Sequence, residues 1–118
     1  MPNSDQRSIE YTDDFVADLK YLLKRFRHIE SDLQPLLDEL QSGAIPGDRI
    51  PNIPEVVYKV RLANSDARRG KRGGYRVIYE IKGQKVILML TVYSKTDQGD
   101  ISTGSIIEIV RRHGASAP

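Results

Sequence analysis

Basic side chains recur at alternate positions in three segments with strand-like sequences. The first segment holds Lys59 and Arg61, the second holds Arg76, and the third ends on Lys95, two residues after Tyr93. Alternate residues of a β-strand share one face, so these cations would lie together on one side of a sheet. Cations add nothing to an apolar core, whereas converging guanidinium and ammonium groups bind phosphate oxygens well. The pattern predicts a phosphate-binding sheet face, with RNA as its ligand.

Such a face could also do chemistry on RNA. Cations beside a phosphate would stabilise the charge that develops when a ribose 2′-hydroxyl attacks it. The reaction also needs a proton acceptor and a proton donor. The two histidines, His28 and His113, fall on predicted helices away from the basic face, so a lysine or a tyrosine must serve. A lysine base would need its pKa lowered from roughly 10, which neighbouring cations would do.

Simpler explanations compete with a functional one at these positions. Cations on an exposed strand are most often solvated or ion-paired, and Glu80 shares the predicted face of Arg76, so an ion pair within the sheet is one alternative. Tyr75 and Tyr79 fall on the apolar face, and we expect both in the core. The histidines lack partners at the spacing of metal ligands, so neither a metal site nor a cofactor is expected.

Length and composition restrict the class of protein. A chain of 118 residues suits one domain, residues 1–118, with an ordered core of about residues 8–113. The hydrophobic fraction of 39% allows one modest core, and no segment approaches the roughly 18 apolar residues of a membrane-spanning helix. The N-terminus lacks the apolar stretch of a secretory signal and there are no cysteines, which together favour a cytoplasmic protein.

Charge is divided unevenly along the chain. Residues 1–55 carry 6 Lys/Arg and 11 Asp/Glu, whereas residues 56–118 carry 12 Lys/Arg and 5 Asp/Glu. The basic second half contains all three strand-like segments and is consistent with a surface that faces a polyanion. Two solvated faces of opposite sign would give the same totals, so the placement of the cations carries the argument.

Two amphipathic helices are predicted in the acidic half. Thr12 is typical of a helix N-cap. The apolar residues that follow it recur at helical spacing and are Phe15, Leu19, Leu22, Leu23 and Phe26. The second helix is expected to begin near Ser31 or Asp32, which places Pro35 in its first turn, and to end at Gly43. We expect the two helices to form a hairpin over the apolar face of the sheet.

Four strands are predicted, and they are residues 7–11, 56–62, 75–82 and 85–95. Gly83 and Gln84 form a two-residue turn between the last two, which places Lys82 opposite Lys85. In that register Arg76 pairs with Thr91 and shares a face with Thr91, Tyr93 and Lys95. Val77, Tyr79, Ile81, Val86, Leu88, Leu90 and Val92 then lie on the apolar face.

Two further segments flank the strands. The connection over residues 63–74 is long, and it contains the basic residues Arg68, Arg69, Lys71 and Arg72. Long loops are usually functional or mobile, and a mobile basic loop suits ribosomal RNA, although a solvated loop would look the same. Ser105 and Glu108 form a capping box that opens a short helix, which ends near His113 and Gly114. The elements combine into an α+β domain, with a helical hairpin packed on a small, mainly antiparallel sheet and a short C-terminal helix.

Three segments together resemble a known family. They are Tyr58–Leu62, Gly74–Tyr79 and Thr91–Lys95, and the glycine–aromatic–arginine strand followed by the tyrosine–serine–lysine strand is similar to the RelE/HigB branch of the RelE/ParE toxin superfamily. The resemblance covers roughly residues 10–112. It implies the toxin of a type II toxin–antitoxin pair, an endoribonuclease that cuts mRNA on the ribosome and is held by a cognate antitoxin protein.

Residue roles follow from the resemblance by position. Lys59 and Arg61 match the basic pair of the family's first sheet strand, Arg76 matches the arginine that stabilises the scissile phosphate, and Lys95 stands at a basic position near the leaving group. RelE has a catalytic tyrosine towards its C-terminus, whereas the corresponding region here, residues 100–102, has none. Tyr93 as its substitute and a lysine as the base are two assignments compatible with this departure.

Two other functions are compatible with the sequence. One is a ParE-like inhibitor of DNA gyrase with the same fold and no nuclease activity. The other is a non-catalytic module that binds RNA or protein and would show salt-dependent binding without cleavage. The full set of strand cations favours the endonuclease, because gyrase-directed relatives need no such set. An acidic or amphipathic antitoxin segment could neutralise the basic face.

Overall fold

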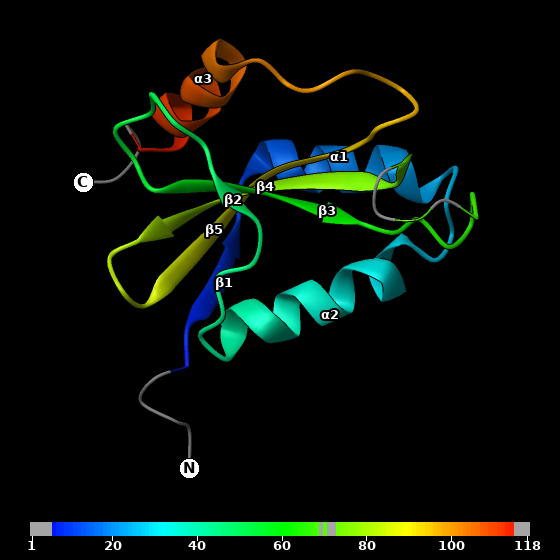
Figure 1. Ribbon diagram of the computed structural model, residues 1–118, viewed down its shortest axis with the longest axis horizontal. Helices are drawn as coiled ribbons and strands as arrows, with labels where there is room; N and C mark the ends of the chain where they lie inside the picture. The colour runs from blue at the N-terminus through cyan, green and yellow to red at the C-terminus, as the bar shows by residue number, and fades with distance from the viewer. Residues whose placement is uncertain (1–5, 69, 71–72, 115–118) are drawn as a thin grey trace.

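The centre of the fold is a five-stranded sheet with the order β1-β5-β4-β3-β2. The structure, a computed structural model, describes residues 6–68, 70 and 73–114 (Figure 1). The strands are β1 (Ser8–Tyr11), β2 (Asp48–Arg49), β3 (Val57–Leu62), β4 (Tyr75–Lys82) and β5 (Val86–Ser94). β1 runs parallel to β5, and the other neighbours are antiparallel. The predicted α+β class with a mainly antiparallel sheet is confirmed, and β2 is a short strand that the sequence did not predict.

In the part of the chain that the structure describes, three helices cover the sheet. They are α1 (Asp13–Leu23), α2 (Ile29–Gln41) and α3 (Thr103–Gly114). α1 and α2 form the predicted hairpin and bury their apolar side chains in one core, and α3 packs on the other face of the sheet. The sheet is therefore the middle of three layers, and each of its faces must supply apolar side chains.

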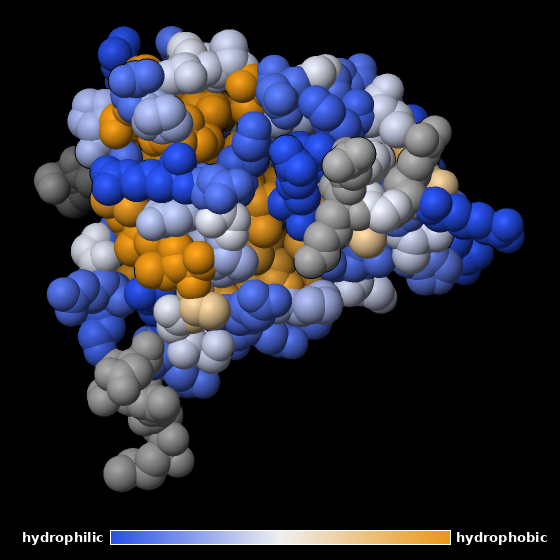
Figure 2. All heavy atoms as spheres, in the orientation of Figure 1, coloured by the Kyte–Doolittle hydropathy of each residue, from blue (hydrophilic) through white to orange (hydrophobic). Residues whose placement is uncertain are grey.

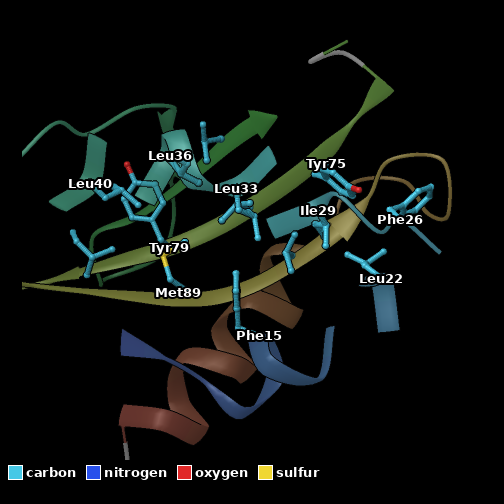
Figure 3. Close-up of a cluster of buried hydrophobic side chains, with 14 residues drawn as sticks. Phe15, Leu22, Phe26, Ile29, Leu33, Leu36, Leu40, Tyr75, Tyr79 and Met89 are labelled. Carbon is cyan, nitrogen blue, oxygen red and sulfur yellow. The ribbon is translucent and has the colours of Figure 1, made fainter. Parts of the chain in front are cut away.

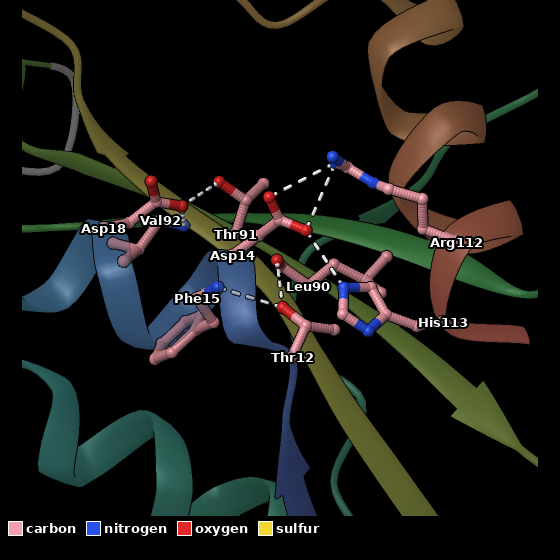
Figure 4. Close-up of polar contacts among 9 residues, drawn as sticks. All are labelled: Thr12, Asp14, Phe15, Asp18, Leu90, Thr91, Val92, Arg112 and His113. Atoms are coloured by element: carbon pink, nitrogen blue, oxygen red, sulfur yellow. Dashed lines mark hydrogen bonds and ion pairs between the residues drawn. The ribbon is translucent and has the colours of Figure 1, made fainter. Parts of the chain in front are cut away.

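α1 begins where the sequence predicts. The Thr12 hydroxyl accepts a hydrogen bond from the Phe15 amide (2.9 Å), which satisfies one of the free amides of the first turn. The same hydroxyl donates to the carbonyl oxygen of Leu90 in β5 (2.7 Å, Figure 4). One buried side chain thus starts the helix and joins it to the sheet.

α2 begins earlier than predicted. Its first residue is Ile29, which is fully buried, so the apolar stripe of the helix extends back by one turn. Pro35 consequently lies inside the helix rather than in its first turn, on the exposed side. Packing of Ile29 offsets the hydrogen bond that the proline cannot make. Gly43 ends the helix as expected, with a φ of 107° that favours glycine.

The β4–β5 hairpin differs from its predicted register in two places. Lys82 pairs with Val86, so residues 83–85 form a three-residue turn and the predicted pairing of Lys82 with Lys85 is wrong. A second shift, a β-bulge, occurs opposite Ile78 and Tyr79, which pair with Thr91 and Met89. Leu90 is the extra residue of the bulge. Arg76 therefore pairs with Tyr93 rather than with Thr91.

Two apolar cores lie on opposite faces of the sheet. The larger lies under the α1–α2 hairpin and includes Tyr75 and Tyr79, both fully buried as predicted (Figure 3). Its other buried members are Phe15, Leu22, Phe26, Ile29, Leu33, Leu36, Leu40, Val60, Val77, Ile87, Met89 and Val92. The smaller lies under α3 and contains Ile53, Val57, Ile78, Leu88, Leu90, Tyr93, Ile106, Ile109 and Val110.

The face assignments of β5 follow from the two register shifts. Between the turn and the bulge the strand is displaced by one residue, so Leu88 and Leu90 face α3 instead of the hairpin. Ile87 and Met89 occupy the positions under the hairpin that were predicted for Leu88 and Leu90. Thr91 pairs with Ile78, two residues from Arg76, so it shares the face of Arg76 as predicted, and its hydroxyl donates to Asp18 of α1.

α3 corrects the prediction that the face opposite the hairpin is open. Its residues Ile106, Ile109 and Val110 are buried against that face, and burial of each such side chain contributes about 1.5–3 kcal/mol. The helix begins at Thr103 because the Ser102 hydroxyl accepts from the Ser105 amide (3.1 Å), so the predicted cap at Ser105 is wrong. The basic residues therefore share their face with an apolar core.

Replacing Thr12 with valine should lower the free energy of unfolding by about 1–2 kcal/mol, because the cap and a buried hydrogen bond are both lost. Urea unfolding followed by circular dichroism measures the change. Thr96→Val is a matched control, since that hydroxyl bonds Ser94 in the loop after β5. Equal stabilities of the two variants would show that Thr12 does not hold α1 on the sheet.

Candidate functional site

Three neighbouring strands bring the predicted site residues together. Arg61 of β3 pairs with Arg76 of β4, which pairs with Tyr93 of β5. Lys95 is the first residue after the end of β5. Its amide donates to the Gly74 carbonyl (2.9 Å), which prolongs the β4–β5 pairing by one residue pair. Lys59 lies two residues before Arg61 on the same face of β3. The prediction that these residues share one face is confirmed.

The centre of the group is an aspartate that the sequence did not predict. One carboxylate oxygen of Asp100 accepts a hydrogen bond from the Lys95 ammonium (3.1 Å) and lies 3.7 Å from the Lys59 ammonium. We call Lys59, Lys95 and Arg76 the basic cluster, and the two contacts of Asp100 the Asp100 bridge. A lone acid in a polar loop has no periodic pattern, so no sequence signal marked it.

The charges of the basic cluster act on Asp100. The Lys95 hydrogen bond, followed by the charge of Lys59, holds the pKa of Asp100 below its ordinary value, and Arg76 adds a smaller effect in the same direction. Asp100 thus stays ionised at physiological pH although its side chain is 56% exposed. The two lysine side chains are about 30% exposed each and form the rim of the site.

Arg76 lies beneath this rim. Its side chain is 2% exposed, and one guanidinium nitrogen donates to the Tyr75 carbonyl (3.2 Å). The expectation of a freely presented arginine is therefore wrong, because the C-terminal part of the chain covers this face. Arg76 instead acts through its field, which adds a small part to the lowering of the pKa of Asp100 and opposes the rise in the pKa of Tyr93. The alternative partner Glu80 lies four residues along β4, about 13 Å away. Burial raises the pKa of Glu80, and the charges that act on it are those of Lys82 and Glu55.

Tyr93 is also buried, with 6% of its surface exposed. Its hydroxyl oxygen accepts a hydrogen bond from the Ile101 amide (3.2 Å) and so fixes the loop next to Asp100. Burial raises the pKa of Tyr93, and the charge of Asp100 raises it further, against the opposing effects of that hydrogen bond and Arg76. The phenol is therefore neutral at physiological pH, in which state it can donate a proton but is a poor acceptor.

A groove of about 320 Å³ adjoins the basic cluster. Lys59, Arg61 and Arg49 contribute its basic side, and Ile101 and Ile106 its apolar side. In the view of Figure 2, hydrophilic side chains alternate with apolar areas rather than forming one continuous polar surface. Arg61 thus belongs to the groove, whereas the Asp100 bridge joins Lys59 and Lys95.

The basic loop after β3 is anchored at its start. The Asp66 carboxylate accepts from the His28 amide (2.7 Å) and lies 2.6 Å from the His28 ring, and Asp32 accepts from the Ser65 amide (3.0 Å). These contacts fix the segment leading to Arg68, which is exposed. The predictions for Arg69, Lys71 and Arg72 fall outside the described residues.

The remaining histidine joins two helices. His113 and Arg112 of α3 both contact the carboxylate of Asp14 at the start of α1, at 2.9 and 3.2 Å (Figure 4). Both histidines therefore pair with carboxylates away from the basic cluster, as their predicted positions implied. Within residues 6–68, 70 and 73–114, no group of three potential metal-ligating acids or histidines occurs. No helix in this part of the chain is long and apolar enough to cross a membrane.

Comparison with known proteins identifies the family. The family model described as the ParE toxin of the type II toxin–antitoxin system parDE matches residues 9–99. The chain belongs to the ParE toxin family. Membership makes it a toxin of the type II class, with a cognate antitoxin as its partner, and confirms the resemblance to the RelE/ParE superfamily.

A solved structure supports the fold of this ParE-family toxin. The chain is similar to an arginine-to-alanine double mutant of E. coli toxin RelE in the free state, with a TM-score of 0.56 and 19% identity over 91% of this chain and 97% of that one. At this identity the likeness concerns the fold. A comparison with curated protein sequences found no match.

The pKa of Asp100 offers a direct test of the site geometry. In a carbon-detected NMR titration, the carboxyl carbon of Asp100 should titrate below the ordinary range of an aspartate. Lys95→Met should raise that midpoint, because it removes the largest of the effects that lower it. Lys20→Met removes an equal charge from α1 and should leave it unchanged. A midpoint that does not respond to Lys95→Met would contradict the Asp100 bridge.

Proposed function

We propose that this ParE-family toxin is an endoribonuclease that cuts mRNA on the ribosome, in the cytoplasm and without a cofactor. The observation that carries the proposal is the convergence of Lys59 and Lys95 on one oxygen of Asp100. A carboxylate oxygen has the charge and hydrogen-bonding character of a phosphate oxygen, so the same two ammonium groups are spaced to hold a phosphate. Arg76 adds a fixed positive field below them.

The proposed reaction is an internal transesterification. The ribose 2′-oxygen forms a bond to the adjacent phosphorus, and the bond from phosphorus to the 5′-oxygen of the next nucleotide breaks. The proton of the 2′-hydroxyl passes to a base, and a proton from an acid passes to the departing 5′-oxygen. The products are a 2′,3′-cyclic phosphate and a free 5′-hydroxyl, so atoms and charge balance without water or metal.

Burial favours one assignment of the proton donor and the proton acceptor. Tyr93 is a neutral phenol close to Arg76 and the Asp100 bridge, which suits the proton donor. One lysine of the basic cluster would then take the part of the acceptor, while the other lysine and Arg76 hold the phosphate. Arg76 stabilises the charge that develops on the phosphate, which in other active sites is worth about a hundred- to a thousandfold in rate.

Primer extension on a reporter mRNA in a cell-free translation reaction tests the endonuclease. The wild-type protein should produce cuts that require ribosomes, and Arg76→Ala should reduce cutting by about a hundredfold or more. Lys95→Met, on the rim, should also reduce cutting and is less able to disturb the fold than a change at buried Arg76. Lys20→Met is the charge-matched control. Undiminished cutting by folded Arg76→Ala would reject the assignment.

A second candidate function is inhibition of DNA gyrase, and the family match favours it. The matched family is described as ParE, and burial of Arg76 makes the cluster less accessible than an open nuclease face would be. We expect no loss of gyrase supercoiling at toxin concentrations that stop translation. Inhibited supercoiling with intact mRNA would reject the endonuclease and support the gyrase inhibitor. Salt-dependent RNA binding without either activity would indicate a non-catalytic binding module.

A further inference from the structure

The anion site of the proposed endonuclease is filled by the chain itself. Asp100 takes the place between Lys59 and Lys95 that a phosphate oxygen would need. A phosphate held by the same two ammonium groups would lie beside the Asp100 carboxylate, and the two anions would repel each other. A phosphate that binds here therefore competes with the Asp100 bridge.

The loop that carries Asp100 is fixed on either side of it. Asp97 pairs with Arg25 beyond the end of α1, and the Ile101 amide donates to the Tyr93 hydroxyl. Gly99, next to Asp100, has open space around the position of a Cβ atom. Glycine leaves the backbone beside Asp100 conformationally free, so the carboxylate can turn away from the two lysines without a change at either anchor. Its side chain is already more than half exposed, so the outward position costs little burial.

Protonation does not open the site. The cluster holds the pKa of Asp100 low, so the carboxylate keeps its charge throughout the physiological range. The facing charged groups are Lys59 from β3, Arg76 from β4 and Lys95 from the end of β5. A competing anion is consequently the means of displacement that the geometry allows.

We propose that Asp100 is an internal competitor that keeps the basic cluster closed to single phosphates and yields it to a polyanion such as RNA. The proposal rests on the proposed function for the identity of that polyanion. A chain of phosphates contacts the groove cations Arg49 and Arg61 as well as the cluster, so its additional contacts can offset the loss of the Asp100 bridge. A single phosphate gains no such contacts.

Binding of an uncleavable probe measures this competition directly. The probe is a fluorescein-labelled 2′-O-methyl RNA oligonucleotide, read by fluorescence anisotropy at fixed salt without ribosomes. Asp100→Asn should bind it about five- to tenfold more tightly than the wild type, the range expected for removing one charge about 4 Å from the site. Asp100→Glu keeps the charge and should bind as weakly as the wild type.

Asp38→Asn is the matched control, because it removes the same charge from the exposed side of α2, outside the cluster and its loop. The gain from Asp100→Asn should also disappear in a Lys95→Met background, as a double-mutant cycle requires. Equal binding by Asp100→Asn and Asp38→Asn, with both variants folded by circular dichroism, would overturn the proposal and leave Asp100 a structural counter-ion. Inorganic phosphate should compete with the probe for binding to Asp100→Asn, and should compete only weakly for binding to the wild type.

The two proposals fail separately. Tighter probe binding by Asp100→Asn without any mRNA cleavage would support the competitor and reject the endonuclease. Ribosome-dependent cleavage through Arg76, with no effect of Asp100→Asn on probe binding, would support the endonuclease and overturn the competitor.

Discussion

The β-bulge in β5 is the feature on which the site depends. It inserts Leu90 between two ladder pairs, and α1 holds it from both sides. Thr12 donates to the Leu90 carbonyl, while Asp18 accepts from the Thr91 hydroxyl and, at 3.4 Å, from the Val92 amide (Figure 4). Backbone groups that a bulge removes from the ladder need partners when they are buried, and α1 supplies them. Beyond the bulge, the strand places Tyr93 opposite Arg76.

The bulge needs a hydrogen-bond acceptor, and Asp18 supplies it at an electrostatic cost. Desolvation raises its pKa, in spite of the two hydrogen bonds that favour the carboxylate. The protein accepts a half-buried acid here because the bulge requires an acceptor. Under α3, Arg76 is a buried cation whose field extends to Tyr93 and Asp100.

Sequence reasoning succeeded where the signal was local. The cap at Thr12, the stop at Gly43 and the burial of Tyr75 and Tyr79 follow from residue type and spacing alone. It failed where distant residues decide, since the bulge is held by side chains about 75 residues away and α3 covers a face that the strands alone leave open.

Two of the errors compensated for each other. The three-residue turn shifts β5 by one position and the bulge shifts it by one more, so the alternation beyond the bulge is restored. Arg76 and Tyr93 consequently share a face although their predicted pairing was wrong, whereas Leu88 lies between the two shifts and faces α3. Asp100 stayed unpredicted because its importance comes from tertiary contacts with Lys59 and Lys95.

The parallel pairing of β1 with β5 has a consequence for folding. The antiparallel β3–β4–β5 unit joins segments that are close in sequence and can form early, whereas Thr12 and Leu90 are 78 residues apart. β1 cannot pair until β5 has been synthesised. Until then the Thr12 hydroxyl that caps α1 lacks its acceptor, the Leu90 carbonyl oxygen. The first strand to emerge from the ribosome is thus the last that the sheet can accept.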